Sequence, residues 1–298
     1  MKNLSWEKKK TLSGIIFLIP FTFFVTLMII IPVINIFRYS LHNMSGFKPT
    51  AEFVGLKNFA AVFHIDGFSD MIIATIIFSV SVTALVVVGG YFIALALDAK
   101  GKGRINRSLM RTFWFFPCLL SGIIVGVIWR IMYNYNGGVV NFILKNIGLE
   151  KINWLETRGV TMVAIIIAQV WSMIGLTVVI FLAGFQNISE DLYDAAKLDG
   201  ASYWQMQRKV VFPLMAPSVT INVLTTNIAA FKAYELPFTI SQGLPGYSTR
   251  LLTRCIYFYS FTTNEYGIAA ALSVILIIVI AGLSLLQLKF LKKREEVF

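Results

Sequence analysis

Six long runs of mainly apolar residues constrain this chain more than any other feature of its sequence. A helix needs about 20 apolar residues to cross the ~30 Å hydrocarbon core of a bilayer, and all six runs reach this length. The composition agrees, because 57% of the residues are hydrophobic and only 14% are charged, too few for the polar surface of a soluble domain. We therefore expect an all-α integral membrane protein with six transmembrane helices, at residues 13–36, 71–97, 112–132, 160–185, 215–238 and 266–289.

The first run predicts a retained span rather than a cleaved signal peptide. The basic start MKNLSWEKKK resembles the n-region of a signal peptide, but the apolar run behind it is too long for an h-region. No small-residue cleavage site follows the run. We expect this span to remain in the protein.

Lysine and arginine are distributed unequally between the two sides of the predicted spans. With the N-terminus inside, the inner segments hold 16 of the 26 basic residues and the outer loops hold 8. The inner segments are 1–12, 98–111, 186–214 and 289–298, and the outer loops are 37–70, 133–159 and 239–265. Because short cytoplasmic loops carry an excess of Lys and Arg, both termini and residues 186–214 are expected in the cytoplasm. The net charge of +11 is explained in this way, since the chain has no nucleic-acid-binding motif.

The polar residues argue against two other classes of membrane protein. An ion-coupled carrier is expected to show paired repeats and more ionisable groups within its spans, and the sequence shows neither. A membrane enzyme needs a cluster of His, Asp, Glu or Cys at one depth, but His42 and His64 both fall in the first outer loop. Cys118 and Cys255 have neither metal-ligand nor CxxC spacing. We expect no catalytic residue and no metal site.

One polar segment, residues 186–214, separates the fourth and fifth runs. Ser189 is a candidate N-cap, and the two acidic residues after it suit the first turn of a helix, where the dipole favours negative charge. Gly200 can turn the chain after this helix, since glycine takes a positive φ at little cost. A second helix, about 202–211, is expected to end before Pro213. The segment is either two short helices bent at Gly200 or an interfacial loop that only links two spans.

The sequence of this segment resembles a known coupling motif. It resembles the "EAA" loop, E-A-A-x-x-x-G, nine residues, then I-x-L-P, of permease subunits from bacterial binding-protein-dependent ABC importers. The changes from Glu, Ile and Leu keep the chemical type at each position. The matching residues are Asp194, Ala195, Ala196, Gly200, Val210, Phe212 and Pro213.

The resemblance extends over nearly the whole chain and is to the sugar-importer branch of that family. It departs after the fifth run, where Gly-Gly-Pro is common in the branch and this chain has QGLPG (242–246). The similar segments are the first span, GLKNF (55–59), YNYNGGVVNFILKNIGL (133–149), NWL (153–155), IFLAGFQNISEDLYDAAKLDGAS (180–202), FKAYELPFTI (231–240) and YGIAAALSVILIIVI (266–280).

The resemblance implies a MetI-like ABC importer permease fold in a bacterial plasma membrane. It implies four partners besides lipid and a sugar substrate: a second related permease subunit, two ATPase subunits and an extracytoplasmic solute-binding protein. It also allows other cargo, such as glycerol phosphate, amino acids or peptides. The chain lacks a G-x-x-x-x-G-K-[ST] phosphate loop, so ATP and Mg²⁺ are expected on the separate ATPase and no cofactor on this chain.

The resemblance further implies that the bent segment docks as a coupling helix in a groove of the ATPase. Ala195 and Ala196 would permit close approach there, and Asp194 and Asp199 would pair with basic groups of the partner. ATP-driven closure of the ATPase pair would then push this lever and tilt the spans between inward-open and outward-open states. Three parts of the chain are expected: residues 1–69 with the first span and outer loop, a five-helix permease core at 70–289, and a basic tail at 290–298.

Candidate residues for the translocation path lie in the fifth run. Lys232 and Glu235 are three residues apart and are expected to share a helix face. They either neutralise each other as a structural ion pair or border the path, since charges within spans usually face the bundle interior or a wet cavity. Asn227 and Tyr234 are the stronger candidates for contact with a neutral sugar, which needs hydrogen bonds and aromatic faces rather than net charge.

Overall fold

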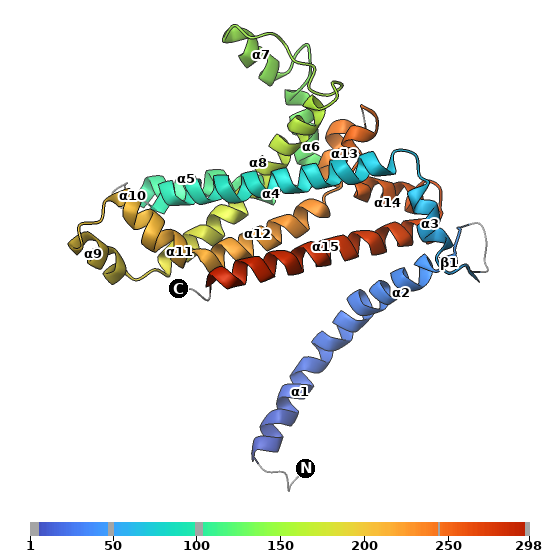
Figure 1. The fold of residues 1–298 in the computed structure, drawn as a ribbon, viewed down its shortest axis with the longest axis horizontal. Helices are drawn as coiled ribbons and strands as arrows, with labels where there is room; N and C mark the ends of the chain where they lie inside the picture. The colour runs from blue at the N-terminus through green and yellow to red at the C-terminus, as the bar shows by residue number, and fades with distance from the viewer. Residues whose placement is uncertain (1–5, 47–50, 99–103, 244, 296–298) are drawn as a thin grey trace. The chain divides into compact units, whose positions relative to one another are not determined.

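The structure is a computed structural model that describes residues 6–46, 51–98, 104–243 and 245–295. The chain folds into two compact units, Met1–Ile65 with Ile256–Ile277, and Asp66–Cys255 with Ile278–Phe298. Regular structure in the described residues is almost entirely helical (Figure 1). One small exception corrects the all-α expectation, because β1 (His42–Asn43) and β2 (Glu52–Phe53) pair antiparallel, with His42 opposite Phe53.

The first predicted span forms a long helical stretch in the first unit. α1 (Trp6–Val25), the π-helix η1 (Thr26–Ile30) and α2 (Ile31–Ser40) follow one another without a gap. The most apolar window of this stretch is 0% buried, as expected of a helix that faces lipid. The π-turn comes directly before Ile31-Pro32, where the proline ring would clash with the carbonyl of a regular α-turn. The helix therefore continues past a proline.

The side chain of Asn58 connects three parts of the first unit. Asn58 lies on α3 (Lys57–Phe63), and its Nδ2 donates to the carbonyls of Ser40 and His42 at 2.9 Å each. The start of α15 (Tyr266–Glu295) approaches the same point, because a Cβ on Gly267 would collide with the His42 carbonyl and the Asn58 amide. The loop after the first span is thus packed against the first turn of α15.

The core of the second unit forms where α4 (Phe68–Asp98) packs against α8 (Val160–Gln186) and α12 (Ala216–Phe231) (Figure 1). One hydrophobic cluster is centred on Phe78 and Ile165, and another on Phe181 and Met215. In a bilayer such van der Waals packing, rather than exclusion of water, holds helices together. Gly90 permits the close approach of α4 and α8, since a Cβ there would lie 2.5 Å from Thr177 Cγ2.

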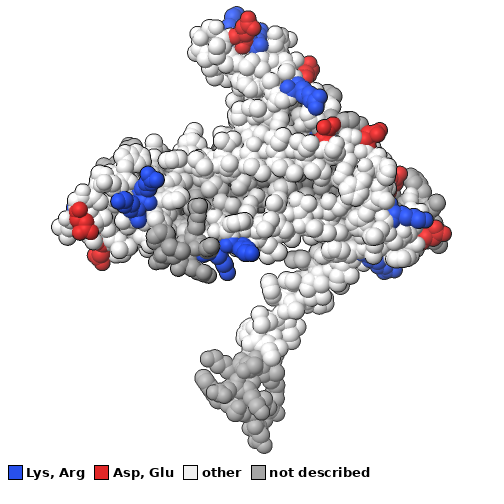
Figure 2. All heavy atoms as spheres, in the orientation of Figure 1, with Lys and Arg blue, Asp and Glu red and all other residues white. Residues whose placement is uncertain are grey.

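Shorter elements surround these three helices. On the face shown in Figure 2, charged side chains of the second unit gather near α9 and near α7, and the surface of α4 between them is uncharged. The shorter elements are α5 (Arg104–Phe115), η2 (Phe116–Leu119), α6 (Gly122–Met132), α7 (Val139–Asn146), α9 (Glu190–Leu198), α10 (Tyr203–Met206), η3 (Gln207–Val211), α11 (Phe212–Leu214), α13 (Glu235–Ser241), η4 (Gly246–Thr249) and α14 (Leu252–Phe261).

The described part of the chain holds four helices that are long and apolar enough to cross a membrane singly, or six spans if two bent pairs are counted. The four helices are Gly14–Ser40, Phe68–Asp98, Val160–Gln186 and Tyr266–Lys292. The bent pairs are Leu109–Leu119 with Gly122–Met132, at 102°, and Tyr203–Leu214 with Ala216–Phe231, at 64°.

The third predicted run is therefore a broken helix, and the prediction of one continuous helix over 112–132 was wrong. Pro117 has no N–H for helical bonding, and the chain leaves the helix two residues after it. Ser121 then takes an extended conformation with ψ 151° and caps α6, its hydroxyl accepting from the backbone N–H of Ile124 at 3.4 Å.

Candidate functional site

The polar segment folds as the two bent helices that its caps predicted. Ser189 Oγ accepts a hydrogen bond from the Asp191 N–H at 3.3 Å, which starts α9. At the other end, Gly200 N–H donates to Lys197 O and Ala201 N–H donates to Ala196 O, the paired bonds of a Schellman motif. This motif needs the left-handed φ of +74° that Gly200 adopts.

A reciprocal cap starts the second helix immediately after the bend. Ser202 Oγ accepts from the Gln205 N–H at 3.3 Å, and Gln205 Oε1 accepts from the Ser202 N–H at 2.8 Å. These two bonds form a capping box, which satisfies two backbone donors that a helix start otherwise leaves free. The bend at Gly200 is therefore held by caps on both of its sides.

The second helix continues past Pro213, which corrects the expectation that it would end there. The π-helix η3 closes with a bond from Phe212 N–H to Gln207 O, and α11 follows it directly. The wide π-turn leaves room for a proline ring that would clash with the carbonyl of a regular α-turn. Motif residues Val210, Phe212 and Pro213 thus lie in a helix that leads into α12.

The outer surface of α9 exposes the residues that the coupling motif singled out. Asp194, Ala195, Asp199 and Gly200 are all exposed, and Ala196 is half-buried. Asp194 forms an ion pair of 2.8 Å with Lys197, with the two side chains 67% and 64% exposed. An exposed pair of this kind contributes only about 0.3–0.5 kcal/mol, so Asp194 can exchange its partner at little cost.

One residue on this surface was missed by the motif comparison. Leu198, in the last turn of α9, has a side chain that is 90% exposed. It stands beside exposed Asp199 and Gly200 at the tip of the segment. A single exposed apolar residue is common on protein surfaces, so this exposure by itself assigns Leu198 no role. The signal in the sequence was an apolar residue directly before the Asp-Gly turn.

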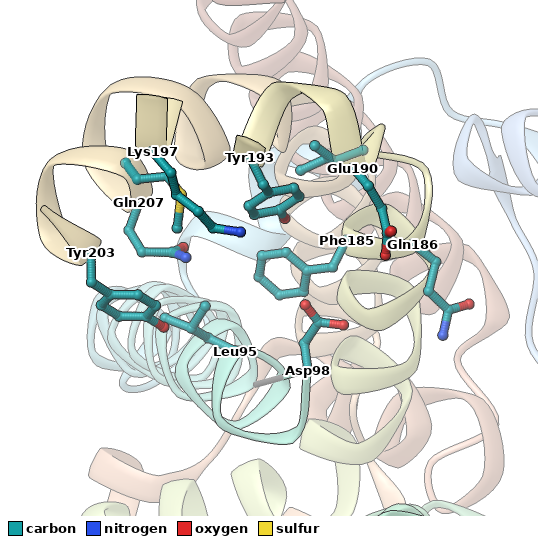
Figure 3. A pocket seen from close by; sticks show the side chains of 11 residues that line it. Leu95, Asp98, Phe185, Gln186, Glu190, Tyr193, Lys197, Tyr203 and Gln207 are labelled. Carbon is teal, nitrogen blue, oxygen red and sulfur yellow. The ribbon is translucent and has the colours of Figure 1, made fainter. Parts of the chain in front are cut away.

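The inner side of the segment encloses a cavity of about 460 Å³. Figure 3 shows Tyr193 and Lys197 reaching from α9 toward Phe185 on α8 and Asp98 at the end of α4. Burial raises the pKa of the Tyr193 hydroxyl, and the nearby Asp98 carboxylate and Tyr203 raise it further. Tyr193 therefore keeps its proton and packs as a neutral group between α9 and the ends of α4 and α8.

A cluster of aromatic rings joins the second helix of the segment to the core. The ring of Tyr91 on α4 packs against Phe181 on α8 at 5.4 Å and against Phe212 on α11 at 5.6 Å. Phe185 on α8 completes the cluster, with its ring 5.6 Å from that of Tyr91. Such edge and tilted ring contacts add about 0.5–1.5 kcal/mol per pair beyond their buried area. These ring contacts join α11 to α4 and α4 to α8.

The candidate path residues of the fifth run do not lie on one helix. α12 ends at Phe231, Lys232 is its C-cap, and Glu235 begins α13. The prediction that Lys232 and Glu235 share a helix face was therefore wrong. Both side chains are exposed, and in the part of the chain that the structure describes they form no ion pair with each other. The break follows from Pro237, which has no N–H to continue the helix.

The other two path candidates occupy different environments. Tyr234 stacks on Phe238 with ring centres 5.4 Å apart, and the Arg254 guanidinium lies 5.2 Å from the centre of the Phe238 ring. Asn227 is only 3% exposed, and its Oδ1 has no hydrogen-bond partner among the described residues. Asn222 lies one and a half turns earlier on α12 and is fully buried. Both its amide oxygen and its amide nitrogen also lack a hydrogen-bond partner among the described residues. The sequence placed Asn222 in this run but gave no reason to select it.

Polar side chains hold the segment 133–155 together as a compact loop. The side chain of Asn141 donates to Tyr135 O and Ile152 O and accepts from Ile152 N–H and Trp154 Nε1–H, at 3.0–3.3 Å. The Trp154 ring stacks on Tyr133 at 5.3 Å, and the Tyr133 hydroxyl donates to Ala164 O on α8. Asn141 is therefore the residue that orders this loop.

Comparison with known proteins decides the family of the chain. Residues 87–293 match the family described as binding-protein-dependent transport system inner membrane component. The chain belongs to this family. Its members are multi-pass membrane permeases, and the predicted resemblance is thereby confirmed.

Several relatives of this permease match it over nearly their full length. The trehalose/maltose transport system permease protein MalF of Thermococcus litoralis is 31% identical over 95% of each chain. The probable starch degradation products transport system permease protein AmyD of Thermoanaerobacterium thermosulfurigenes is 32% identical over 94% of each chain. These relatives are transporter permease subunits rather than enzymes.

The fold of this permease is also found in a solved structure. A chain of a bacterial ABC transporter involved in the import of the acidic polysaccharide alginate superimposes with a TM-score of 0.84. The two chains are 20% identical, and the match covers 97% of this chain and 98% of the other. The MetI-like importer permease fold is therefore confirmed in its overall architecture.

Proposed function

We propose that this chain is a permease subunit of an ATP-driven carbohydrate importer and forms half of the translocation pathway. The polar segment 186–214, called the coupling segment from here on, carries the proposal. It exposes a bent, doubly capped surface outward and packs aromatic rings inward on α4 and α8. The family and the sugar-permease relatives support the same assignment. In mechanism, docking of an ATPase on Ala195, Asp199 and Gly200 moves the segment, and the Tyr91 ring cluster carries the motion into the spans.

The proposed arrangement in the membrane has six spans with both termini in the cytoplasm. It counts each bent pair as one span and places residues 186–214 inside, where the excess of Lys and Arg belongs. The bacterial plasma membrane is the proposed location. The division into residues 1–69, a permease core at 70–289 and a basic tail at 290–298 is proposed with it; residues 296–298 lie outside the described part of the chain.

The proposed partners are a second related permease, two ATPase subunits and an extracytoplasmic solute-binding protein. An alginate transporter of the same fold has been solved in complex with a pentasaccharide-bound periplasmic protein, which supports the last of these. ATP and Mg²⁺ would be used by the ATPase subunits, with no cofactor on this chain. Asn227, Lys232, Tyr234 and Glu235 are proposed to border the path of the sugar.

Uptake of a panel of labelled sugars by cells lacking only this chain tests the proposal. We expect selective loss of one mono- or oligosaccharide and its recovery with the wild-type chain. If no sugar is affected, the carbohydrate assignment is wrong, and the panel then moves to glycerol phosphate, amino acids and peptides. Uptake that persists after depletion of ATP but collapses with the proton gradient would instead contradict an ATP-driven importer.

A further inference from the structure

A groove of about 420 Å³ lies beside the coupling segment, between α4 and the helical stretch α10–α11. Leu95 and Gln207 line both this groove and the cavity of Figure 3, so the two adjoin. The walls of the groove are almost wholly apolar. Side chains of α4 form one wall, and side chains of the second coupling helix, which is the continuous stretch α10, η3 and α11, form the other. They include Val88, Phe92, Trp204, Phe212 and Val219.

The α4 wall of the groove is the end of a longer apolar stripe. Ile73, Ile77, Val80, Val88 and Phe92 recur at helical spacing on α4, and each is 49–56% exposed. In a membrane span such a face meets lipid chains or another span. The groove is the place where this stripe reaches the coupling segment. The proposed topology puts this point at the boundary between the bilayer and the cytoplasm.

A cation and an indole ring lie on the opposite wall. Trp204 and Arg208 are four residues apart on the second coupling helix, and both line the groove. Trp204 is 69% exposed, and Arg208 is exposed without a hydrogen-bond or ion-pair partner among the residues that the structure describes. Trp and Arg at a membrane boundary are the groups that contact lipid headgroups. Figure 2 shows Lys and Arg gathered beside this end of the second unit.

We propose that this groove binds one acyl chain of an anionic phospholipid from the cytoplasmic leaflet, with the headgroup phosphate beside Arg208. The cytoplasmic leaflet carries a negative surface potential, which complements the positive charge of the Arg208 guanidinium. The inference rests on the cytoplasmic placement of residues 186–214 in the proposed function. A lipid in this position would contact α4, α11 and α12 together, and would therefore stiffen the joint through which the coupling segment moves the spans.

The groove and the apolar stripe that continues from it suit a lipid chain. A flexible acyl chain can follow the groove along the exposed stripe of α4 while its headgroup stays beside Arg208. A neutral lipid would fill the same space but would leave Arg208 without a counter-charge.

Photolabelling of the complete importer in lipid nanodiscs tests this inference. The probes are phosphatidylglycerol and phosphatidylcholine that carry the same diazirine-labelled acyl chain, and the sites of labelling are mapped by mass spectrometry. We expect phosphatidylglycerol to label the peptides with Val88, Phe92 or Trp204 about fivefold more than phosphatidylcholine. A difference of about fivefold is the change in binding expected from the attraction of one basic residue to an anionic lipid. Arg208→Gln should remove this preference. Lys209→Gln, which neutralises the adjacent exposed cation outside the groove lining, should leave it unchanged.

Equal labelling by the two lipids, or a preference that survives Arg208→Gln, would overturn the inference. Cross-links from a diazirine placed at residue 92 to a partner subunit rather than to lipid would overturn it as well. Sugar uptake by proteoliposomes made from the same wild-type preparation reports the proposed function separately. Normal uptake without lipid preference defeats only the lipid site. A lipid preference that Arg208→Gln removes, in a preparation without ATP-driven sugar uptake, defeats only the carbohydrate-importer assignment.

Discussion

The backbone carbonyl of Ala233 accepts a hydrogen bond of 2.7 Å from the hydroxyl of Thr253. In a continuous helix this carbonyl would accept from the N–H of residue 237, but Pro237 has no N–H and its ring would clash with that same carbonyl. The chain breaks between α12 and α13 for this reason, and Thr253, at the start of α14, supplies the missing donor. The break exposes Lys232 and Glu235 at two separate helix ends.

Replacing Thr253 by Val tests the role of this bond, because it removes the hydroxyl and keeps the shape of the side chain. We expect the free energy of unfolding to fall by about 1 kcal/mol, since the Ala233 carbonyl then loses its partner. Thr253→Ser keeps the hydroxyl and serves as the control. Thermal unfolding of the purified importer measures both, and equal midpoints for the two variants would contradict the assigned role.

Gly200→Asp should uncouple transport and leave insertion into the membrane intact. A Cβ at Gly200 meets nothing within 4 Å, and Asp tolerates the left-handed conformation better than most residues, so the chain itself can fold. The added carboxylate would stand on the exposed tip that the proposed function docks on the ATPase. We expect ATP-driven uptake to fall at least about tenfold, the effect of ~1.4 kcal/mol in docking.

Gly148→Asp is the matched control for that variant. Gly148 also has a positive φ, +81°, and open space around its Cβ position, but it follows α7 in the outer loop. Its substitution should leave uptake near the wild-type level. Normal uptake by Gly200→Asp, or equal losses in both variants, would contradict docking at the bend.

Phe212→Ala should weaken the transmission of motion from the coupling segment. It removes one ring from the cluster around Tyr91, while the Phe212 side chain is 47% exposed, so the cost in stability is small. We expect ATP hydrolysis by the importer to continue while sugar uptake per ATP falls. Phe142→Ala, which truncates a ring that is 66% exposed on α7, is the control. An unchanged ratio of uptake to hydrolysis in Phe212→Ala would argue against the ring cluster as the joint.

Asn141→Leu should loosen the outer loop without affecting the coupling segment. The substitution removes a side chain that makes four hydrogen bonds and is 2% exposed, and it takes the hydrogen-bond partner from the half-buried backbone N–H and C=O of Ile152. We expect destabilisation of about 2–3 kcal/mol and faster protease cleavage between residues 147 and 153. Cleavage at the wild-type rate would show that Asn141 does not order the loop.

Cys255 should react slowly with alkylating reagents in the folded protein. Burial raises the pKa of its thiol to about 11 from 9.0, against the opposing effect of nearby Arg250 and Arg254. Because only the thiolate reacts, its fraction at pH 8 is about a hundredfold below that of an ordinary thiol and grows tenfold per pH unit up to the raised pKa. Iodoacetamide labelling of the Cys118→Ser variant measures this, with the denatured protein as control. Equal rates in both states would contradict the burial of the thiol.

Local signals in the sequence were sufficient to predict the form of the coupling segment. Ser189 caps a helix wherever acidic residues and a helical run follow it, and Gly200 allows the left-handed turn that ends the same helix. Both depend on neighbours within a few residues. The π-turn before Pro213 was not predictable in this way, because the same proline usually ends a helix and here the packing of Phe212 on Tyr91 favours its continuation.

The sequence by itself determined the class of the protein, the apolar runs, the coupling segment and its caps, because long apolar stretches and caps act over short distances along the chain. Only the tertiary structure decided where those runs break and which polar groups meet. The break at Ala233 depends on a hydroxyl that lies 20 residues further along the chain, and the burial of Asn222 depends on the packing of α12 against α4 and α8. Contacts between distant segments supply these partners, and no local pattern of residues records which segments will meet.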